Sequence, residues 1–354
     1  MYVHEKFENK TYSLTLTQSF SDLENQKNNK PFYIPLQMGL LNSQGKETHS
    51  ELLILNEKSK TWTFKSDDRP VLSLNRNFSA PVKLKWSLPH ADLLHLIKFD
   101  TDEFNRREAC MKMLLDQIQK LILDSGKGEK LVANPDIISA LGFVLNDSKI
   151  DAQFKALILT LPSDTILAQE EKVLNPQAFS AAKREITTAF VKKFEKEILE
   201  TYKKHHALNS TGDRALKNLL MHQLVTAGST EGLSLCEKQY QTATNMTDSL
   251  HALIVLCDSN SPQKDNALKD FYQKWSADSV VFNKWLSAQA MSKTGNTFES
   301  VQKCTQVVGF DKNNPNNMYS LHNVFAGNYL KFHSDSEPTY QWYCDEILRI
   351  DAVN

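Results

Sequence analysis

Glycine and proline are scarce in this sequence, with 11 of each among 354 residues. The composition shows no signature of disorder, and the glycines are too sparse for a loop that cradles phosphate. The G-x-S-x-G segment that presents a catalytic serine is also missing. Because 41% of the residues are apolar, the chain can bury large cores, and its length predicts two structural units.

The chain also lacks the cysteine patterns of disulfide frameworks and zinc clusters. Its five cysteines are odd in number and none forms a C-x-x-C pair, so we expect reduced, buried thiols. No apolar run reaches the roughly 18 residues that span a bilayer, and the first ten residues contain no apolar stretch of the secretory type. The chain is therefore predicted to be cytoplasmic, with no membrane partner.

An excess of charge of one sign is missing as well. The 41 basic and 42 acidic residues leave a net charge of −1, which gives no reason to expect nucleic acid as a partner. The basic run Lys203–His206 is offset by Glu195, Glu197 and Glu200 nearby. This arrangement indicates a solvated helix face rather than a site for polyanions.

No metal site is recognisable. None of the ten histidines is spaced i, i+4 from another, and the only His-Glu dipeptide, His4-Glu5, has Glu8 where a zinc motif needs its second histidine. Among the acids near residue 100, Asp102 is better explained as a helix cap than as one of a catalytic pair with Asp100. The residues alone therefore predict no catalytic residue, metal ligand or cofactor in this chain.

Residues 1–88 alternate apolar and polar side chains at the two-residue period of strands. This pattern predicts an immunoglobulin-like antiparallel β-sandwich of about six or seven strands. The clearest strands are Tyr12–Thr17, Phe32–Gln37, Leu52–Leu55, Thr61–Phe64, Val71–Leu74 and Val82–Trp86. Pro35 has no N–H for a ladder, so its strand is expected at a sheet edge or at a bulge. Glu24–Asn29 is expected to be a polar loop.

From Pro89 onward the apolar residues recur at helical spacing. Four helix starts are predicted at Asn-Pro or Ser-Pro pairs that begin at Asn134, Asn175, Ser261 and Asn314. In each pair the polar side chain caps free amides, and the proline loses no needed donor. The aromatic residues between Phe271 and Trp285 are expected to pack in the core. Helices without intervening strands predict an all-α, armadillo- or HEAT-like solenoid over residues 89–354, although no fixed repeat period is legible.

Five stretches, in the same order, resemble the C-terminal half of the aminopeptidase N family, the bacterial alanyl aminopeptidases of the gluzincin class of zinc metallopeptidases. They are Phe32–Leu40 (FYIPLQMGL), Arg76–Leu84 (RNFSAPVKL) with Asp102–Arg106 (DEFNR), Asn245–Asp248 (NMTD), Phe271–Trp275 with Asn283–Ala290, and Asn314–Asn316 (NPN). Because the likeness runs in order along nearly the whole chain, chance is a poor explanation.

In that family a zinc-dependent catalytic domain precedes a small β-sandwich and a large helical cap. The resemblance implies that residues 1–88 are the sandwich and that residues 89–354 are the cap, truncated at its C-terminus. The family's H-E-x-x-H zinc motif and its G-x-M-E-N motif, which holds the amine of the substrate, do not occur in this sequence. The chain is therefore expected to be inactive alone, with zinc bound elsewhere in the parent enzyme.

The resemblance also implies a role and partners. The chain would cap the active site, form the peptide cavity and gate access to it. Its partners would be the N-terminal catalytic domain of the same polypeptide and peptide substrates. In the family an arginine that faces the cavity follows the N-P-N motif, but Tyr319 occupies that position here. Tyr319 and Asn316 are the candidate cavity-lining residues. The alternative, that Tyr319 only packs against its neighbours, stays open. A tyrosine can hydrogen-bond a peptide but cannot attract a carboxylate by charge.

Two other expectations concern association. A solenoid that ends near residue 354 would expose an apolar flank of its last helix, with Trp342, Ile347 and Leu348, and would tend to self-associate. The alternative function is an independent scaffold of sandwich and solenoid that binds protein partners. Catalysis by an unrecognised nucleophile is disfavoured, because no Cys or Ser pairs with a His in a familiar local motif.

Overall fold

The computed structural model describes residues 1–19, 30–334 and 336–352. The loop predicted at Glu24–Asn29 lies outside these residues. The chain divides into two compact units. The first contains residues 1–117, 134–150 and 157–159, and the second contains residues 118–133, 151–156 and those from 160 onward. The predicted domain boundary at residue 88 stays a prediction.

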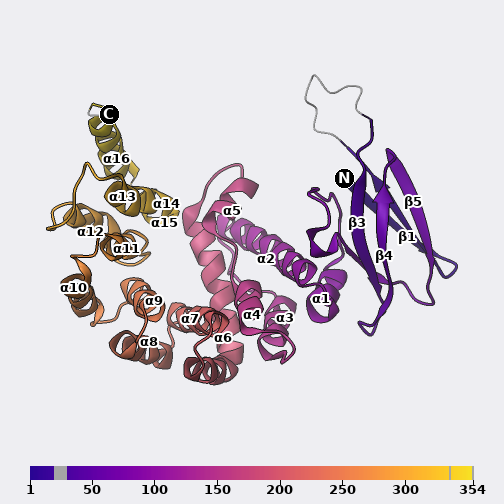
Figure 1. Ribbon diagram of the computed structural model, residues 1–354, viewed down its shortest axis with the longest axis horizontal. Coiled ribbons are helices and arrows are strands. Elements are labelled where there is room, and N and C mark those ends of the chain that lie inside the picture. Colours follow the sequence, from indigo (N-terminus) through magenta and orange to yellow (C-terminus); the bar gives the residue numbers. More distant parts are fainter. Residues whose placement is uncertain (20–29, 335, 353–354) are drawn as a thin grey trace. The chain divides into compact units, whose positions relative to one another are not determined.

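The first unit begins with two three-stranded antiparallel sheets, which confirms the predicted sandwich (Figure 1). One sheet has the strand order β1-β2-β5 and the other has the order β4-β3-β6. The strands are β1 (Tyr2–Glu8), β2 (Thr11–Thr17), β3 (Ile34–Leu41), β4 (Glu47–Leu55), β5 (Ser59–Lys65) and β6 (Val71–Leu74). Strand β1 was not among the strands that the pattern singled out.

The two sheets share one apolar core. Alternate residues of β2 from Tyr12 to Leu16 are fully buried, whereas the Ser and Thr residues between them are only partly covered. Leu36, Met38 and Leu40 of β3 supply the opposing face of the core. Burying each leucine contributes about 2 kcal/mol. A one-residue slip in register would turn all of these side chains to solvent, so the apolar pattern fixes the pairing.

The expectation for Pro35 is wrong. Strand β3 is the central strand of its sheet, and its register shift against β4 lies between Leu40 and Leu41. Pro35 is tolerated because β6 pairs with β3 only from Met38 to Leu41. One side of Pro35 therefore has no partner strand among the described residues, and no ladder bond is lost there.

The segment Val82–Trp86, predicted to be a strand, is extended but forms only an isolated bridge, in which Lys85 pairs with Tyr2 in parallel. Its alternation still holds, because its three apolar side chains pack on the sandwich core and its two lysines are exposed. Pro81 and Pro89 flank the segment and cannot donate to a ladder, which limits pairing at both ends.

A single 3-10 turn, η1 (Arg76–Phe78), follows the strands. The helices α1 (His90–Phe99), α2 (Glu103–Gly126) and α3 (Pro135–Asn146) come next, and α2 continues into the second unit. Asp102 caps α2, as predicted, because its Oδ1 accepts the N–H of Asn105 at 2.8 Å. Its Oδ2 accepts the backbone N–H of Asn77 at 2.9 Å. One carboxylate thus ties the turn η1 to the start of α2.

The second unit is a succession of helices with no strand among its described residues (Figure 1). They are α4 (Ala152–Leu159), whose last three residues belong to the first unit, α5 (Asp164–Glu170), α6 (Pro176–Ala207), α7 (Thr211–Thr226), α8 (Thr230–Thr242), α9 (Met246–Cys257), α10 (Lys264–Trp275), α11 (Ser279–Ala290), α12 (Thr297–Cys304), α13 (Pro315–Met318), η2 (Tyr319–Asn323), α14 (Val324–Gly327), α15 (Tyr329–Phe332) and α16 (Ser336–Asp351). Helix α6 packs on α7, α7 on α8 and α8 on α9. Contacts between successive helices are typical of a solenoid, and the predicted order of β-sandwich and then helices is confirmed.

Three of the four predicted helix starts are confirmed. Asn134, Asn175 and Asn314 each accept a backbone N–H at the start of α3, α6 and α13. Ser261 does not cap α10. It accepts the N–H of Gln263 at 3.0 Å instead, because the two residues after it form a turn before the helix begins.

The predicted aromatic core of the second unit is confirmed except at Trp275, which is 39% exposed. Phe271 and Phe282 are buried, and the ring of Trp285 stacks on that of Phe282 with centroids 5.8 Å apart. Tyr272 closes this cluster, with its ring centroid 5.0 Å from that of Trp285. In the described part of the chain, no helix has the length and apolar character needed to cross a membrane.

The expectation for Trp342 is wrong, because this residue packs into the core instead of lying on an exposed flank. Its ring lies 5.6 Å from that of Phe298, centroid to centroid, in an edge-on arrangement. Ile347 and Leu348 on the same helix α16 are 50% and 66% exposed. Self-association through these two residues stays a prediction.

Candidate functional site

The two predicted cavity-lining residues lie on a short segment of the second unit. Helix α13 begins after Asn314, whose side chain accepts the N–H of Asn316 at 3.0 Å. Asn316 is exposed, and Tyr319, the first residue of η2, is 62% exposed. The phenol of Tyr319 is therefore available as a hydrogen-bond donor and acceptor.

Asn317 anchors this segment from within. It is 2% exposed, and its Nδ2 donates to Oδ1 of Asn283 at 2.7 Å. Its Oδ1 accepts the backbone N–H of Asp311 at 2.8 Å. Both polar ends of a buried amide are thus satisfied, which fixes the backbone that presents Asn316 and Tyr319.

The residues of η2, from Tyr319 to Asn323, form a π-helix. Such wide turns are rare and frequently occur at functional sites. Here the turn buries Leu321 and His322 and leaves Tyr319 outside. The His322 ring stacks on Trp342 with centroids 4.6 Å apart. Burial lowers the pKa of His322 to about 4, so the imidazole is neutral at pH 7.

A buried ionic network stiffens the middle of the second unit. Lys217 is 2% exposed, and its Nζ donates to Oδ2 of Asp248 at 2.8 Å. Asn218 and Asn245 donate to the same carboxylate at 3.1 Å and 2.9 Å. Burial opposes ionisation of Asp248, but these three donors together hold its pKa below the ordinary value.

The four buried cysteines are poor candidates for a nucleophile. Four of the five are buried, and Cys344 is exposed. Burial raises the pKa values of Cys110, Cys236, Cys257 and Cys304 to about 12. A thiol that stays protonated is a poor nucleophile and a poor metal ligand.

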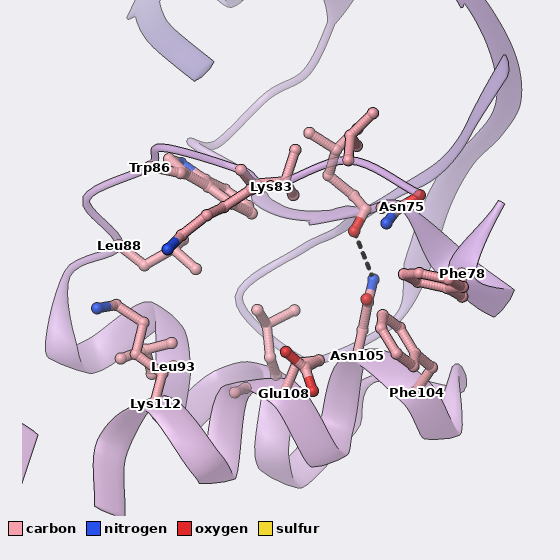
Figure 2. A pocket seen from close by; sticks show the side chains of 15 residues that line it. Asn75, Phe78, Lys83, Trp86, Leu88, Leu93, Phe104, Asn105, Glu108 and Lys112 are labelled. Carbon is pink, nitrogen blue, oxygen red and sulfur yellow. Dashed lines mark hydrogen bonds between the residues drawn. The ribbon is translucent and has the colours of Figure 1, made fainter. Parts of the chain in front are cut away.

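A pocket of about 350 Å³ opens in the first unit between residues 82–88 and the helices α1 and α2. Figure 2 shows Lys83, Trp86 and Leu88 on the side of the extended segment, and Leu93, Glu108 and Lys112 on the side of the helices. Most lining side chains are apolar, and three charged groups join them. The pocket thus combines an apolar floor with ionic groups of both signs.

Buried and partly buried hydrogen bonds hold the two walls in place. On one wall, Nε1 of Trp86 donates to Oε1 of Glu5 at 2.7 Å, and the hydroxyl of Tyr12 donates to the other carboxylate oxygen at 2.6 Å. On the opposite wall, Nδ2 of Asn105 donates to the carbonyl of Leu74 at 3.0 Å. The dashed line in Figure 2 marks this hydrogen bond of Asn105.

The rim of the pocket contains a strained turn. Asn75, Asn77 and Phe78 have φ values of 64°, 54° and 50°. Asparagine tolerates this left-handed region, whereas a bulky phenylalanine is an outlier there. The Asn75 side chain both donates to and accepts from the backbone of Ala80, at 3.1 Å and 2.9 Å, and this bridge stabilises the turn. The strain presents the Phe78 ring to Phe104, with centroids 5.3 Å apart.

The pocket and the turn were missed by reasoning from the sequence. The segment Arg76–Leu84 carries part of the family resemblance, and its pattern predicts only the start of a strand at Val82. The available signal was the two asparagines that flank Arg76 just after a strand, because asparagine favours left-handed turns. In contrast, the described residues contain no group of three His, Cys, Asp or Glu side chains that could hold a metal ion.

Comparisons with known proteins match nearly the whole chain. A family model described as "Domain of unknown function (DUF3458) Ig-like fold" matches residues 1–87, and one described as "Domain of unknown function (DUF3458_C) ARM repeats" matches residues 90–354. The chain is 32% identical to Aminopeptidase N of Haemophilus influenzae over 97% of its length, and 28% identical to Aminopeptidase N of Escherichia coli over 98%.

A solved structure is similar along the entire chain. The crystal structure of Legionella pneumophila aminopeptidase A in complex with aspartic acid matches 100% of this chain, with a TM-score of 0.85 and 28% sequence identity. This chain spans only 41% of the Haemophilus protein and 42% of the Escherichia and Legionella proteins. The matched region is therefore less than half of each relative.

Proposed function

The chain belongs to the family of DUF3458 Ig-like and ARM-repeat domains, and we propose that it is the non-catalytic C-terminal part of a zinc-dependent aminopeptidase, which releases N-terminal amino acids from peptides. The observation that carries this proposal is the match of 97% of this chain to 41% of Aminopeptidase N of Haemophilus influenzae. Its partners would be the N-terminal catalytic part of the same polypeptide and peptide substrates, with neither nucleic acid nor a membrane.

In this proposal the helical domain, predicted from residue 89, caps the active site, encloses a peptide cavity and gates access to it. Asn316 and Tyr319 line that cavity. Their exposure, on a backbone fixed by the buried Asn317, supports this role. An uncharged phenol would hydrogen-bond the amide groups of a peptide and would not select a terminal carboxylate.

We propose that the zinc ion of such an enzyme is held outside the described residues of this chain. Its described residues hold no group of three suitable ligands, and its sequence contains no H-E-x-x-H. The metal and its chemistry would belong to the catalytic part of the polypeptide. The contribution of this chain would be substrate enclosure and positioning.

The proposal places the protein in the bacterial cytoplasm. All five cysteines are free, and the four buried ones are held as protonated thiols. Such thiols suit a reducing compartment. The similar proteins from Haemophilus and Escherichia are bacterial, which supports the same assignment.

The capping role is tested by comparing a catalytic part from the same organism with and without this chain. The two samples are given a short alanyl peptide and a folded protein with an N-terminal alanine. If the chain encloses the active site, it should raise the preference for the short peptide at least about tenfold. An unchanged preference, with binding of unrelated proteins instead, would favour the alternative of an independent scaffold.

A further inference from the structure

The pocket between residues 82–88 and helices α1 and α2 has the properties of a small-molecule site. Its volume of about 350 Å³ lies at the lower end of the roughly 300–1,000 Å³ of ligand pockets. Leu88, Leu93 and Leu96 give it an apolar interior, and the rings of Trp86 and Phe104 line it as well. A single apolar side chain therefore fits it better than an extended peptide.

The walls are built before any ligand arrives. Trp86 is held by Glu5, and Asn105 is held by the end of strand β6. Phe78, at the rim, has a backbone conformation that costs on the order of 1–3 kcal/mol. Strain of this kind persists where surrounding contacts fix a special geometry, and a preformed pocket lowers the cost of ordering on binding.

The charged groups of the lining define the polar end of the ligand. Lys83 and Lys112 contribute two ammonium groups, and Glu108 contributes one carboxylate. Among the described residues no ion pair is formed by Lys83 or Glu108, and Lys112 has one at 3.6 Å to Asp116. The unpaired ammonium of Lys83 attracts a carboxylate, to which the Lys112 ammonium adds positive charge, and the unpaired carboxylate of Glu108 attracts an amine.

From this combination we infer that the pocket binds an apolar amino-acid residue through its free carboxylate, with the side chain on the apolar floor and the carboxylate at Lys83 and Lys112. The residue is either a free hydrophobic amino acid, whose ammonium group pairs with Glu108, or the C-terminal residue of a peptide. The inference does not require the proposed function. If that function holds, a free amino acid is the product of the enzyme, and the pocket senses product.

Calorimetric titration of this chain tests the inference and distinguishes the two sources. The ligands are L-phenylalanine, N-acetyl-L-phenylalanine, which mimics a C-terminal residue, and L-phenylalanine amide, which has no carboxylate. We expect saturable binding with a Kd of about 1 mM for at least one of the first two, and at least about tenfold weaker binding of the amide. Preference for the free amino acid identifies it as the ligand, whereas equal binding of the first two identifies a peptide C-terminus.

Charge-reversal variants locate the site without disturbing the core. Lys83→Glu should weaken binding at least about tenfold, because it replaces an exposed ammonium at the pocket with a carboxylate. Lys149→Glu changes an exposed lysine of the same unit that does not line the pocket, and it should bind normally. No saturable binding of either carboxylate ligand up to about 10 mM, or equal weakening by both variants, would overturn the inference.

Discussion

Arg76 occupies the space that a side chain at position 39 would need. A Cβ built on Gly39 in strand β3 would overlap the guanidinium of Arg76. That guanidinium is buried, pairs with Asp100 at 2.9 Å and also contacts Glu47. The absence of a side chain at position 39 thus allows a buried ion pair to connect the sandwich with the end of α1.

Gly39→Ala is therefore expected to destabilise the protein by about 2–3 kcal/mol, because the methyl group displaces Arg76 from Asp100. Urea denaturation measures the change as a lower midpoint at unchanged slope. Gly126→Ala is the matched control, since a Cβ there meets no atom within 4 Å. The control should be neutral or stabilising by up to about 1 kcal/mol. Equal stability of the two variants would remove the role assigned to Gly39.

The buried His322 predicts a loss of stability in acid. In the unfolded chain the imidazole has its ordinary pKa of 6.5, whereas burial lowers the pKa of His322 in the folded state to about 4. The unfolded state is therefore the more protonated one within that window, and stability falls as the pH decreases from 6.5 to 4. For this one group the loss amounts to roughly 3 kcal/mol.

His322→Phe keeps the stacking on Trp342 and removes the titrating group. We expect a shallower decline of the free energy of unfolding between pH 6.5 and pH 4. His222 and His251 have pKa values lowered to about 4 as well, mainly by burial, so some decline remains. Parallel curves for His322→Phe and the wild type would contradict the prediction.

The Lys217–Asp248 pair predicts strong coupling. Lys217→Met leaves the Asp248 carboxylate buried without its cation and should cost about 3–5 kcal/mol. Asp248→Asn should lower the free energy of unfolding less in the Lys217→Met variant than in the wild type. A double-mutant cycle then gives a clear interaction energy between the two residues. Lys303→Met, in the exposed pair with Glu299, should change stability by less than about 1 kcal/mol. Additive costs at Lys217 and Asp248 would exclude the coupling.

Tyr319 is expected to act on substrate and not on stability. Because its ring is 62% exposed, Tyr319→Phe should change the free energy of unfolding by less than about 0.5 kcal/mol. In an enzyme assembled from this chain and a catalytic part, the same change should raise KM for a tripeptide about threefold to tenfold. Tyr33→Phe, at a tyrosine that is 69% exposed in the first unit, is the control. Identical KM values for both variants would leave Tyr319 outside the cavity.

Local chemistry explains which parts of the fold the sequence predicts. The caps at Asn134, Asn175 and Asn314 depend on a side chain and the next few amides, so the Asn-Pro dipeptide identifies all three. The Ser261-Pro262 dipeptide does not cap its helix, because a turn follows it before α10 begins. Strand β2 follows from alternation over seven residues. The segment Val82–Trp86 alternates equally well, yet it has no partner ladder, because pairing depends on where a distant strand lies.

The functional candidates depend on contacts between distant residues, which pattern alone does not give. Arg76 reaches Asp100 and Glu47 across 24 and 29 positions, and Trp86 reaches Glu5 across 81 positions. The His322 ring in the π-turn stacks on the ring of Trp342, which lies on a later helix. Tyr319 was identified only through the family resemblance, since nothing in its local pattern separates a cavity residue from an exposed one.

The most direct test of the central claim is a titration of a catalytic part with this chain, followed by hydrolysis of an alanyl chromogenic substrate. The account predicts that this chain alone neither hydrolyses the substrate nor retains stoichiometric zinc. It predicts that activity rises with added chain and reaches a plateau at one chain per catalytic part. Hydrolysis or tightly bound zinc in the purified chain alone would contradict the account.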